Sequence, residues 1–173
     1  NIPARPSYIG HWTEHLLPDD CAYPNSKEIL SQGSPIGRKL GLTAIGIHIE
    51  LLHPGRRTSW PHAESLEEEF AYVLEGTPEV WVDGVVHRLA PGDFVAFPAG
   101  TGIAHVFLNN TTTTCKLLVG GESTKKGNQI HYPLHSKRNA ELAQKNLWWE
   151  SAPKNELGAH DGLTDELRKN PKD

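Results

Sequence analysis

The feature that most limits the fold of this chain is a series of short apolar runs, separated by turn residues, between Leu42 and Gly120. The runs recur about every 8–12 residues, and Gly, Pro or Asp stands between them. In residues 43–51 the apolar residues alternate with small or polar ones, and a period of two is typical of a β-strand. Short strands at this spacing predict an antiparallel sandwich or barrel of the jelly-roll kind.

A second strong signal is Asp83-Gly84, a two-residue hairpin turn between residues 79–82 and 85–89. No segment between Leu42 and Gly120 has the length and periodicity of a helix. We therefore predict an all-β domain. Its further strands are expected at residues 69–74, 94–97, 104–108 and 115–119.

The segments on either side of this region have a different character. Residues 1–41 contain five prolines, which predicts an extended N-terminal arm, with one helical turn over 26–32. Residues 122–173 are polar and predict a C-terminal extension with short helices at 139–147 and 164–169. The arm, the barrel at 42–121 and the extension are expected to form one structural domain.

Composition excludes several classes of protein. No run approaches the roughly 18–20 apolar residues that span a bilayer, and the net charge of −4 argues against a nucleic-acid partner. Cys21 and Cys115 provide no disulfide framework. No signal peptide is visible at residues 1–10, so we expect a cytoplasmic protein.

Four side chains in the predicted strands can carry chemistry. His62 and Glu64 are two residues apart, so on a strand they point to the same face. Glu69 opens the next strand, and His105 stands on a later one. A jelly roll brings distant strands together, and two imidazoles with two carboxylates are a reasonable ligand set for a divalent metal.

These residues lie in two motifs that resemble those of the cupin superfamily. In the first motif Glu64 stands where a second His is usual, and in the second motif Gly100 and His105 are separated by four residues instead of two. The stretch at residues 99–105 is also similar to a branch of small single-domain cupins. The first motif begins one residue early, at Gly55. The matching positions are His62, Glu69 and Gly76 in the first motif and Gly92, Pro98, Gly100, His105 and Asn109 in the second.

The resemblance implies a cupin-type antiparallel β-barrel and one divalent metal ion held by His62, Glu64, Glu69 and His105. With two carboxylates, zinc is favoured, and iron, manganese or nickel is the alternative. Glu64 has a second possible role, as a general base or salt-bridge partner beside a metal with three ligands.

Other residues are candidates for the pocket wall. Trp60 shares a face with His62, and Phe107 shares one with His105, so both can line a pocket or fill the core. Phe97 has the same two possibilities. His48 lies on the small-residue face of its strand, where it can line the pocket or form a hydrogen bond at an edge.

Two functions follow from this site. In the first, the protein is an enzyme that uses the metal as a Lewis acid in isomerisation, elimination, decarboxylation or hydrolysis, or for O₂ activation. In the second, it is a non-catalytic small-molecule or sugar-binding protein whose metal is structural or absent. The resemblance further implies a homodimer, formed by sheet packing and exchange of the arm.

Overall fold

The computed structural model describes residues 4–123 and 125–171, and its architecture is mainly β. The strands that the sequence predicts are all present, and short additional elements occur in the arm and the extension. The elements, in chain order, are η1 (Trp12–His15), β1 (Gln32–Ser34), α1 (Ile36–Lys39), β2 (Ile45–Leu52), β3 (Ala63–Glu64), β4 (Glu69–Glu75), β5 (Glu79–Val82), β6 (Val85–Arg88), β7 (Phe94–Phe97), β8 (His105–Leu108), β9 (Cys115–Glu122), β10 (Ile130–His131), α2 (Ser136–Ala143) and α3 (Asp165–Lys169).

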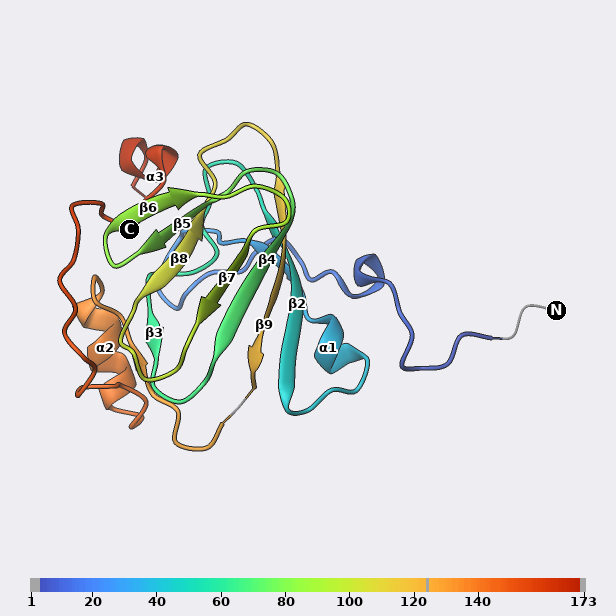
Figure 1. Cartoon of the computed structure of the whole chain (residues 1–173), viewed down its shortest axis with the longest axis horizontal. Coiled ribbons are helices and arrows are strands. Elements are labelled where there is room, and N and C mark those ends of the chain that lie inside the picture. The colour runs from blue at the N-terminus through green and yellow to red at the C-terminus, as the bar shows by residue number, and fades with distance from the viewer. Residues whose placement is uncertain (1–3, 124, 172–173) are drawn as a thin grey trace.

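Two antiparallel sheets form the barrel (Figure 1). The larger sheet has the order β1-β2-β9-β4-β7, and the smaller has the order β6-β5-β8. A short third pair joins β3 to β10, so a strand of the C-terminal extension lies beside Ala63 and Glu64 of the first motif. The predicted jelly-roll class is confirmed.

The core lies between the two sheets. Val73 pairs with Leu117 and Ala71 with Val119 across β4 and β9, and this face of the large sheet packs on Val80 and Phe107 of the small one. In the same register His48 lies opposite Val119, which places the His48 side chain on the inner face of β2.

The C-terminal extension covers the outer face of the small sheet. Trp81, which is fully buried, packs with Trp149 and Ala152 of the extension, and its indole N–H donates to the carbonyl of His160. The backbones also approach closely, since a Cβ on Gly84 would collide with the amide nitrogen of Gly158. The extension therefore packs closely against the barrel.

A buried ion pair joins the arm, the barrel and the extension. Arg57 is 2% exposed, and its guanidinium donates to both carboxylate oxygens of Glu28 at 2.6 and 2.8 Å and to the carbonyl of Gly162 at 2.9 Å. Glu28 also accepts from the indole of Trp60. The expected helical turn at 26–32 is absent, because the chain runs extended there and directs Glu28 inward to Arg57.

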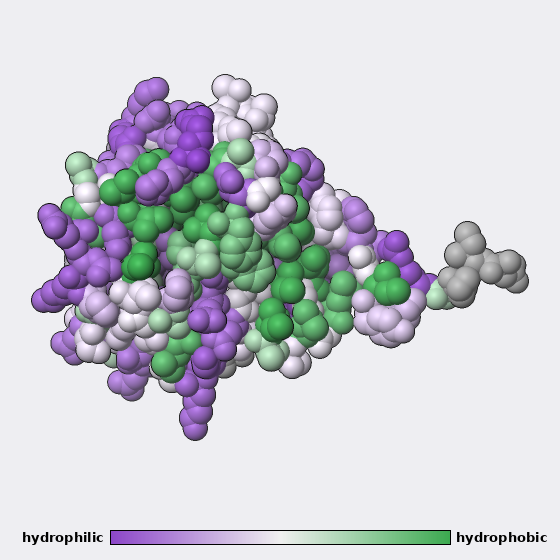
Figure 2. All heavy atoms as spheres, viewed as in Figure 1, coloured by the Kyte–Doolittle hydropathy of each residue, from purple (hydrophilic) through white to green (hydrophobic). Residues whose placement is uncertain are grey.

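The outer face of the large sheet is apolar. Phe70 lies opposite Ala96, and Tyr72 opposite Phe94 and Leu118, with all of these side chains on the face away from the core. Phe94 is 59% exposed. Figure 2 shows hydrophobic residues gathered over this sheet.

The expected helix at 139–147 is displaced toward the N-terminus, since α2 spans Ser136–Ala143 and Asn146, at φ 56°, lies in the left-handed region beyond its end. The expected terminal helix at 164–169 is confirmed, with the Thr164 hydroxyl accepting from the amide of Leu167. Among the residues described, no helix has the length and apolar character that crossing a bilayer requires.

Candidate metal centre

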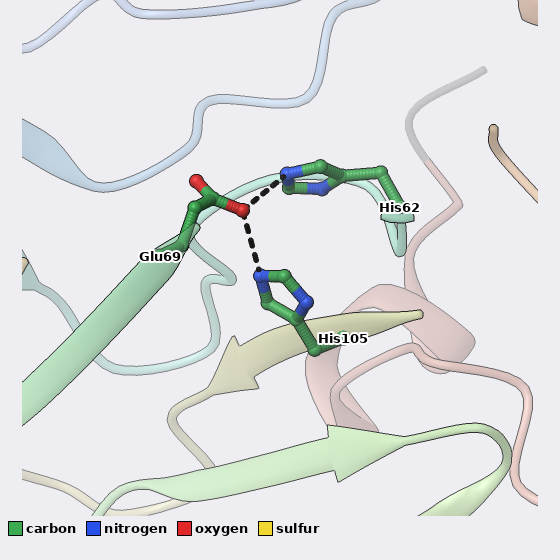
Figure 3. A group of neighbouring side chains, drawn as sticks. All are labelled: His62, Glu69 and His105. Carbon is green, nitrogen blue, oxygen red and sulfur yellow. Dashed lines mark ion pairs between the residues drawn. The ribbon is translucent and has the colours of Figure 1, made fainter. Parts of the chain in front are cut away.

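Three of the predicted ligands meet inside the barrel. His62 and His105 face each other in an isolated antiparallel bridge, and their imidazole centroids lie 5.0 Å apart. Glu69, at the start of β4, directs Oε2 toward both rings, 3.3 Å from His105 Nε2 and 3.8 Å from His62 Nε2 (Figure 3). The three ligand atoms lie within 4.8 Å of one another, which suits a single metal ion.

Neighbouring groups fix the two imidazoles. His62 Nδ1 is 2.8 Å from the carbonyl oxygen of Trp60, which can only accept, so Nδ1 carries the proton and Nε2 keeps its lone pair for the centre. Phe97 of β7 stacks on His105 with centroids 3.4 Å and planes 7° apart. Both rings are therefore held in place before a ligand binds.

The charges are arranged for cation binding. Burial raises the pKa of Glu69, but the imidazole groups of His105 and His62 beside it more than offset this effect and hold the pKa at about 2. Burial also lowers the pKa of His105, which favours the neutral imidazole that metals require. At neutral pH Glu69 is thus a carboxylate, and the burial of His105 favours a neutral nitrogen beside it.

An unsatisfied oxygen provides the test of whether these residues fit a metal. Oε2 of Glu69 is buried, and no hydrogen bond reaches it from any residue described. Its nearest contact with His105 is the ion-pair approach of Nε2 at 3.3 Å. A buried anionic oxygen without a donor is costly, and a divalent cation between the three side chains would satisfy it. The donor set therefore fits a metal ion.

Glu64 does not belong to this three-residue group. It follows His62 on the same face, but its Oε2 accepts a hydrogen bond from the side-chain amide of Asn128. Burial raises the pKa of Glu64 to about 7, and the negative charges of Glu69 and Glu67 add to this effect. A carboxyl group in this state can accept or release a proton near neutral pH.

The four predicted wall residues lie in different surroundings. Phe97 stacks on His105, as described above, and Phe107 packs edge-on against Phe97 in the core. Trp60 is stacked between Tyr23 and His135, at 4.1 and 4.2 Å, and also lines an outer cavity of about 470 Å³.

His48 lies on the inner face of β2, two strands away from Glu69 in the order β2-β9-β4. Its Nδ1 is 3.7 Å from Glu50 Oε1, and the His48 side chain is 44% exposed. It does not belong to the three-residue group.

Three residues near the centre were not expected from the sequence. The ring of Tyr132 lies 5.7 Å from that of His62, and its hydroxyl is 3.4 Å from that of Tyr23, so the arm and the extension both reach the site. Asn128 contacts Glu64. All three lie outside the two motifs, and no spacing in the sequence marks them.

Comparison with known proteins agrees with this geometry. Residues 48–121 match the family model for the cupin domain, and no curated protein matches the chain. A crystal structure assigned as a sugar phosphate isomerase from Acidithiobacillus ferrooxidans is 33% identical, with a TM-score of 0.57, over 60% of this chain and 65% of that one. A cupin-superfamily sugar phosphate isomerase from Silicibacter pomeroyi is 31% identical, with a TM-score of 0.57, over 59% of this chain and 64% of that one.

This chain thus spans slightly less than two thirds of the length of both structures. A polyketide cyclase from Streptomyces resistomycificus is 20% identical, with a TM-score of 0.61, over 81% of this chain and 97% of that one, and it shares the fold. The barrel, the two-His and one-Glu group and the match over residues 48–121 together identify this part of the chain as a cupin domain.

Proposed function

We propose that the protein is a metal-dependent enzyme that moves a proton on a small polar substrate, in a reaction of the isomerase or lyase type. The observation that carries this proposal is the buried, unsatisfied Oε2 of Glu69 between two oriented imidazoles. A divalent ion held by His62, Glu69 and His105 would act as a Lewis acid that polarises a carbonyl or hydroxyl oxygen of the substrate.

The protein residues have separate roles in this proposal. His62 and His105 direct ring nitrogen atoms at the centre, burial favours the neutral form of His105, and Glu69 contributes one negative charge. Glu64 lies beside this group and takes or returns the proton at the substrate carbon. Zinc suits this chemistry, iron would favour the O₂-activating alternative, and manganese or nickel fits the same donor atoms.

Sugar phosphates are the first substrate class to test. The support is the 33% identity to the structure assigned as a sugar phosphate isomerase, together with a site that pairs a metal group with a carboxyl group of raised pKa. Both features suit proton transfer at a carbon next to a carbonyl.

Solvent exchange tests this function. The metal-loaded protein is incubated in D₂O with a panel of aldose and ketose phosphates, and NMR follows deuterium at the carbon next to the carbonyl. We expect exchange with the wild type, and a loss of at least about 100-fold in Glu64→Gln with its metal retained. A metal-loaded wild type that exchanges no deuterium but binds a member of the panel would favour the non-catalytic alternative.

The homodimer is a second part of the proposal, with another copy of the chain on the outer face of the large sheet. Phe94 and Ile45 are 59% and 50% exposed there, and they line an apolar cavity of about 360 Å³. The arm carries Tyr8 and Ile9, 70% and 49% exposed, and extends away from its own barrel (Figure 1). Light scattering should give twice 19.1 kDa, and Phe94→Asp should give the monomer.

A further inference from the structure

The side-chain amide of Asn128, in the C-terminal extension, can adopt only one orientation. Its Oδ1 accepts three hydrogen bonds, from the hydroxyl of Ser65 at 3.2 Å, the amide of Leu66 at 2.9 Å and the amide of Glu67 at 3.3 Å. Rotating the amide by 180° would place its NH₂ group against these donors. Nδ2 must therefore point the other way, and there it donates to Oε2 of Glu64.

The backbone around Asn128 is fixed as well. Ile130 of β10 pairs with Glu64 of β3, and Ser65 and Gln129 exchange hydrogen bonds at 2.9 Å from the Ser65 amide and 2.7 Å to its hydroxyl. Asn128 cannot follow Glu64 if the carboxylate moves, because the same amide holds the turn at residues 65–67. The hydrogen bond thus ties the Glu64 carboxylate to a rigid point.

The carboxylate of Glu64 lies on the same strand face as a residue of the candidate metal centre. His62, two residues earlier on the same face, belongs to the three-residue group. A free carboxylate at position 64 would be drawn to a divalent cation there. What opposes this movement is the hydrogen bond from Asn128.

We propose that Asn128 is a positioning residue that holds the Glu64 carboxylate beside the metal instead of on it, so that the centre has three protein ligands and an open side for substrate. This inference rests on the proposed metal centre. Without the Asn128 donor, Glu64 becomes a fourth ligand and closes the open side.

Asn128→Asp is the most selective variant. It keeps an oxygen for the three donors of residues 65–67, so the turn is retained. It replaces the donor to Glu64 with a carboxylate oxygen, which repels the Glu64 carboxylate. Asn128→Asp combined with Glu64→Gln reverses the pair and restores one hydrogen bond between the two positions. The matched control is Asn110→Asp. The side chain of Asn110 also accepts a hydrogen bond from a backbone amide, and it donates one to the carboxylate of Glu79 at 2.8 Å.

Cobalt substitution provides the measurement, since the visible absorption of Co²⁺ reports its ligands. We expect Asn128→Asp to shift the Co²⁺ bands and to raise Zn²⁺ affinity in chelator competition by about 10-fold. The double variant and Asn110→Asp should both keep the wild-type bands. Unchanged bands in Asn128→Asp, or a shift that persists in the double variant, would overturn the role of Asn128. A folded wild type that binds neither Co²⁺ nor Zn²⁺ would overturn this role and the metal centre together.

Discussion

The phenyl ring of Phe97 lies flat against the imidazole of His105, with centroids 3.4 Å and planes 7° apart. Phe97 ends β7 in the large sheet, and His105 begins β8 in the small one, so the contact links the two sheets at the candidate metal centre. The stacking buries His105, which is 6% exposed, and fixes the direction of its Nε2.

Phe97→Leu should weaken metal binding without unfolding the protein. Leucine keeps most of the apolar volume but cannot hold the imidazole plane, so we expect Zn²⁺ affinity to fall by about 10-fold or more in chelator competition. The control is Phe94→Leu on the same strand, where the ring faces outward and is 59% exposed. Equal affinities in the two variants would argue against a role of the stacking in orienting His105.

The buried pair of Glu28 and Arg57 should dominate the stability of the arm. Glu28→Gln leaves the guanidinium of Arg57 buried without its counter-charge, which should lower the free energy of unfolding by about 3–5 kcal/mol. Glu75, paired with Lys116 but 65% exposed, is the control, and Glu75→Gln should cost less than about 1 kcal/mol. Urea unfolding of both variants measures the difference, and similar midpoints would contradict the account.

The barrel could be predicted from the sequence because its signals are local. Alternation along 43–51 and the Asp83-Gly84 turn report directly on strands and a hairpin, and β2, β5 and β6 follow them. The structure of the flanking segments is harder to predict from the sequence. The expected turn at 26–32 was wrong because Glu28 is directed by Arg57, 29 residues away, and no local pattern carries that contact.

Within the candidate site, only the residues at motif positions could be predicted from the sequence. His62, Glu69 and His105 stand at motif positions, and the structure brings them together. The hydrogen bond between Glu64 and Asn128 joins residues 64 positions apart. It depends on the pairing of β3 with β10. Each of these strands has only two residues, too few to produce a recognisable pattern in the sequence.

Because the extension packs closely on the barrel, replacing Gly84 by alanine should reduce stability more than the same replacement at Gly92. Gly84 and Gly92 both have positive φ, +87° and +100°, but a Cβ on Gly92 meets nothing within 4 Å, whereas one on Gly84 strikes Gly158. Gly92→Ala should cost about 1–2 kcal/mol from the backbone alone, and Gly84→Ala should cost clearly more. Thermal unfolding compares them, and equal costs would show that the extension yields easily.

Acid should weaken the end of the extension in a defined pH range. Hydrogen bonds from Arg168 hold the pKa of Asp161 at about 2, below its ordinary value of 3.8. The stabilisation is therefore complete above pH 4 and is lost as the pH falls toward 2. Because Asp161 is 47% exposed, we expect at most about 1 kcal/mol. The stability difference between wild type and Asp161→Asn should shrink over this range, and a constant difference would refute the assignment.

The metal content of the purified protein tests the central claim most directly. Elemental mass spectrometry should find about one divalent ion per chain in the wild type, in Glu64→Gln and in the exposed-histidine control His87→Ala. His105→Ala, folded by circular dichroism, should retain less than about a tenth of that amount. A folded wild type without a divalent ion, even after incubation with Zn²⁺, or a His105→Ala variant with a full complement, would contradict the metal centre proposed for His62, Glu69 and His105.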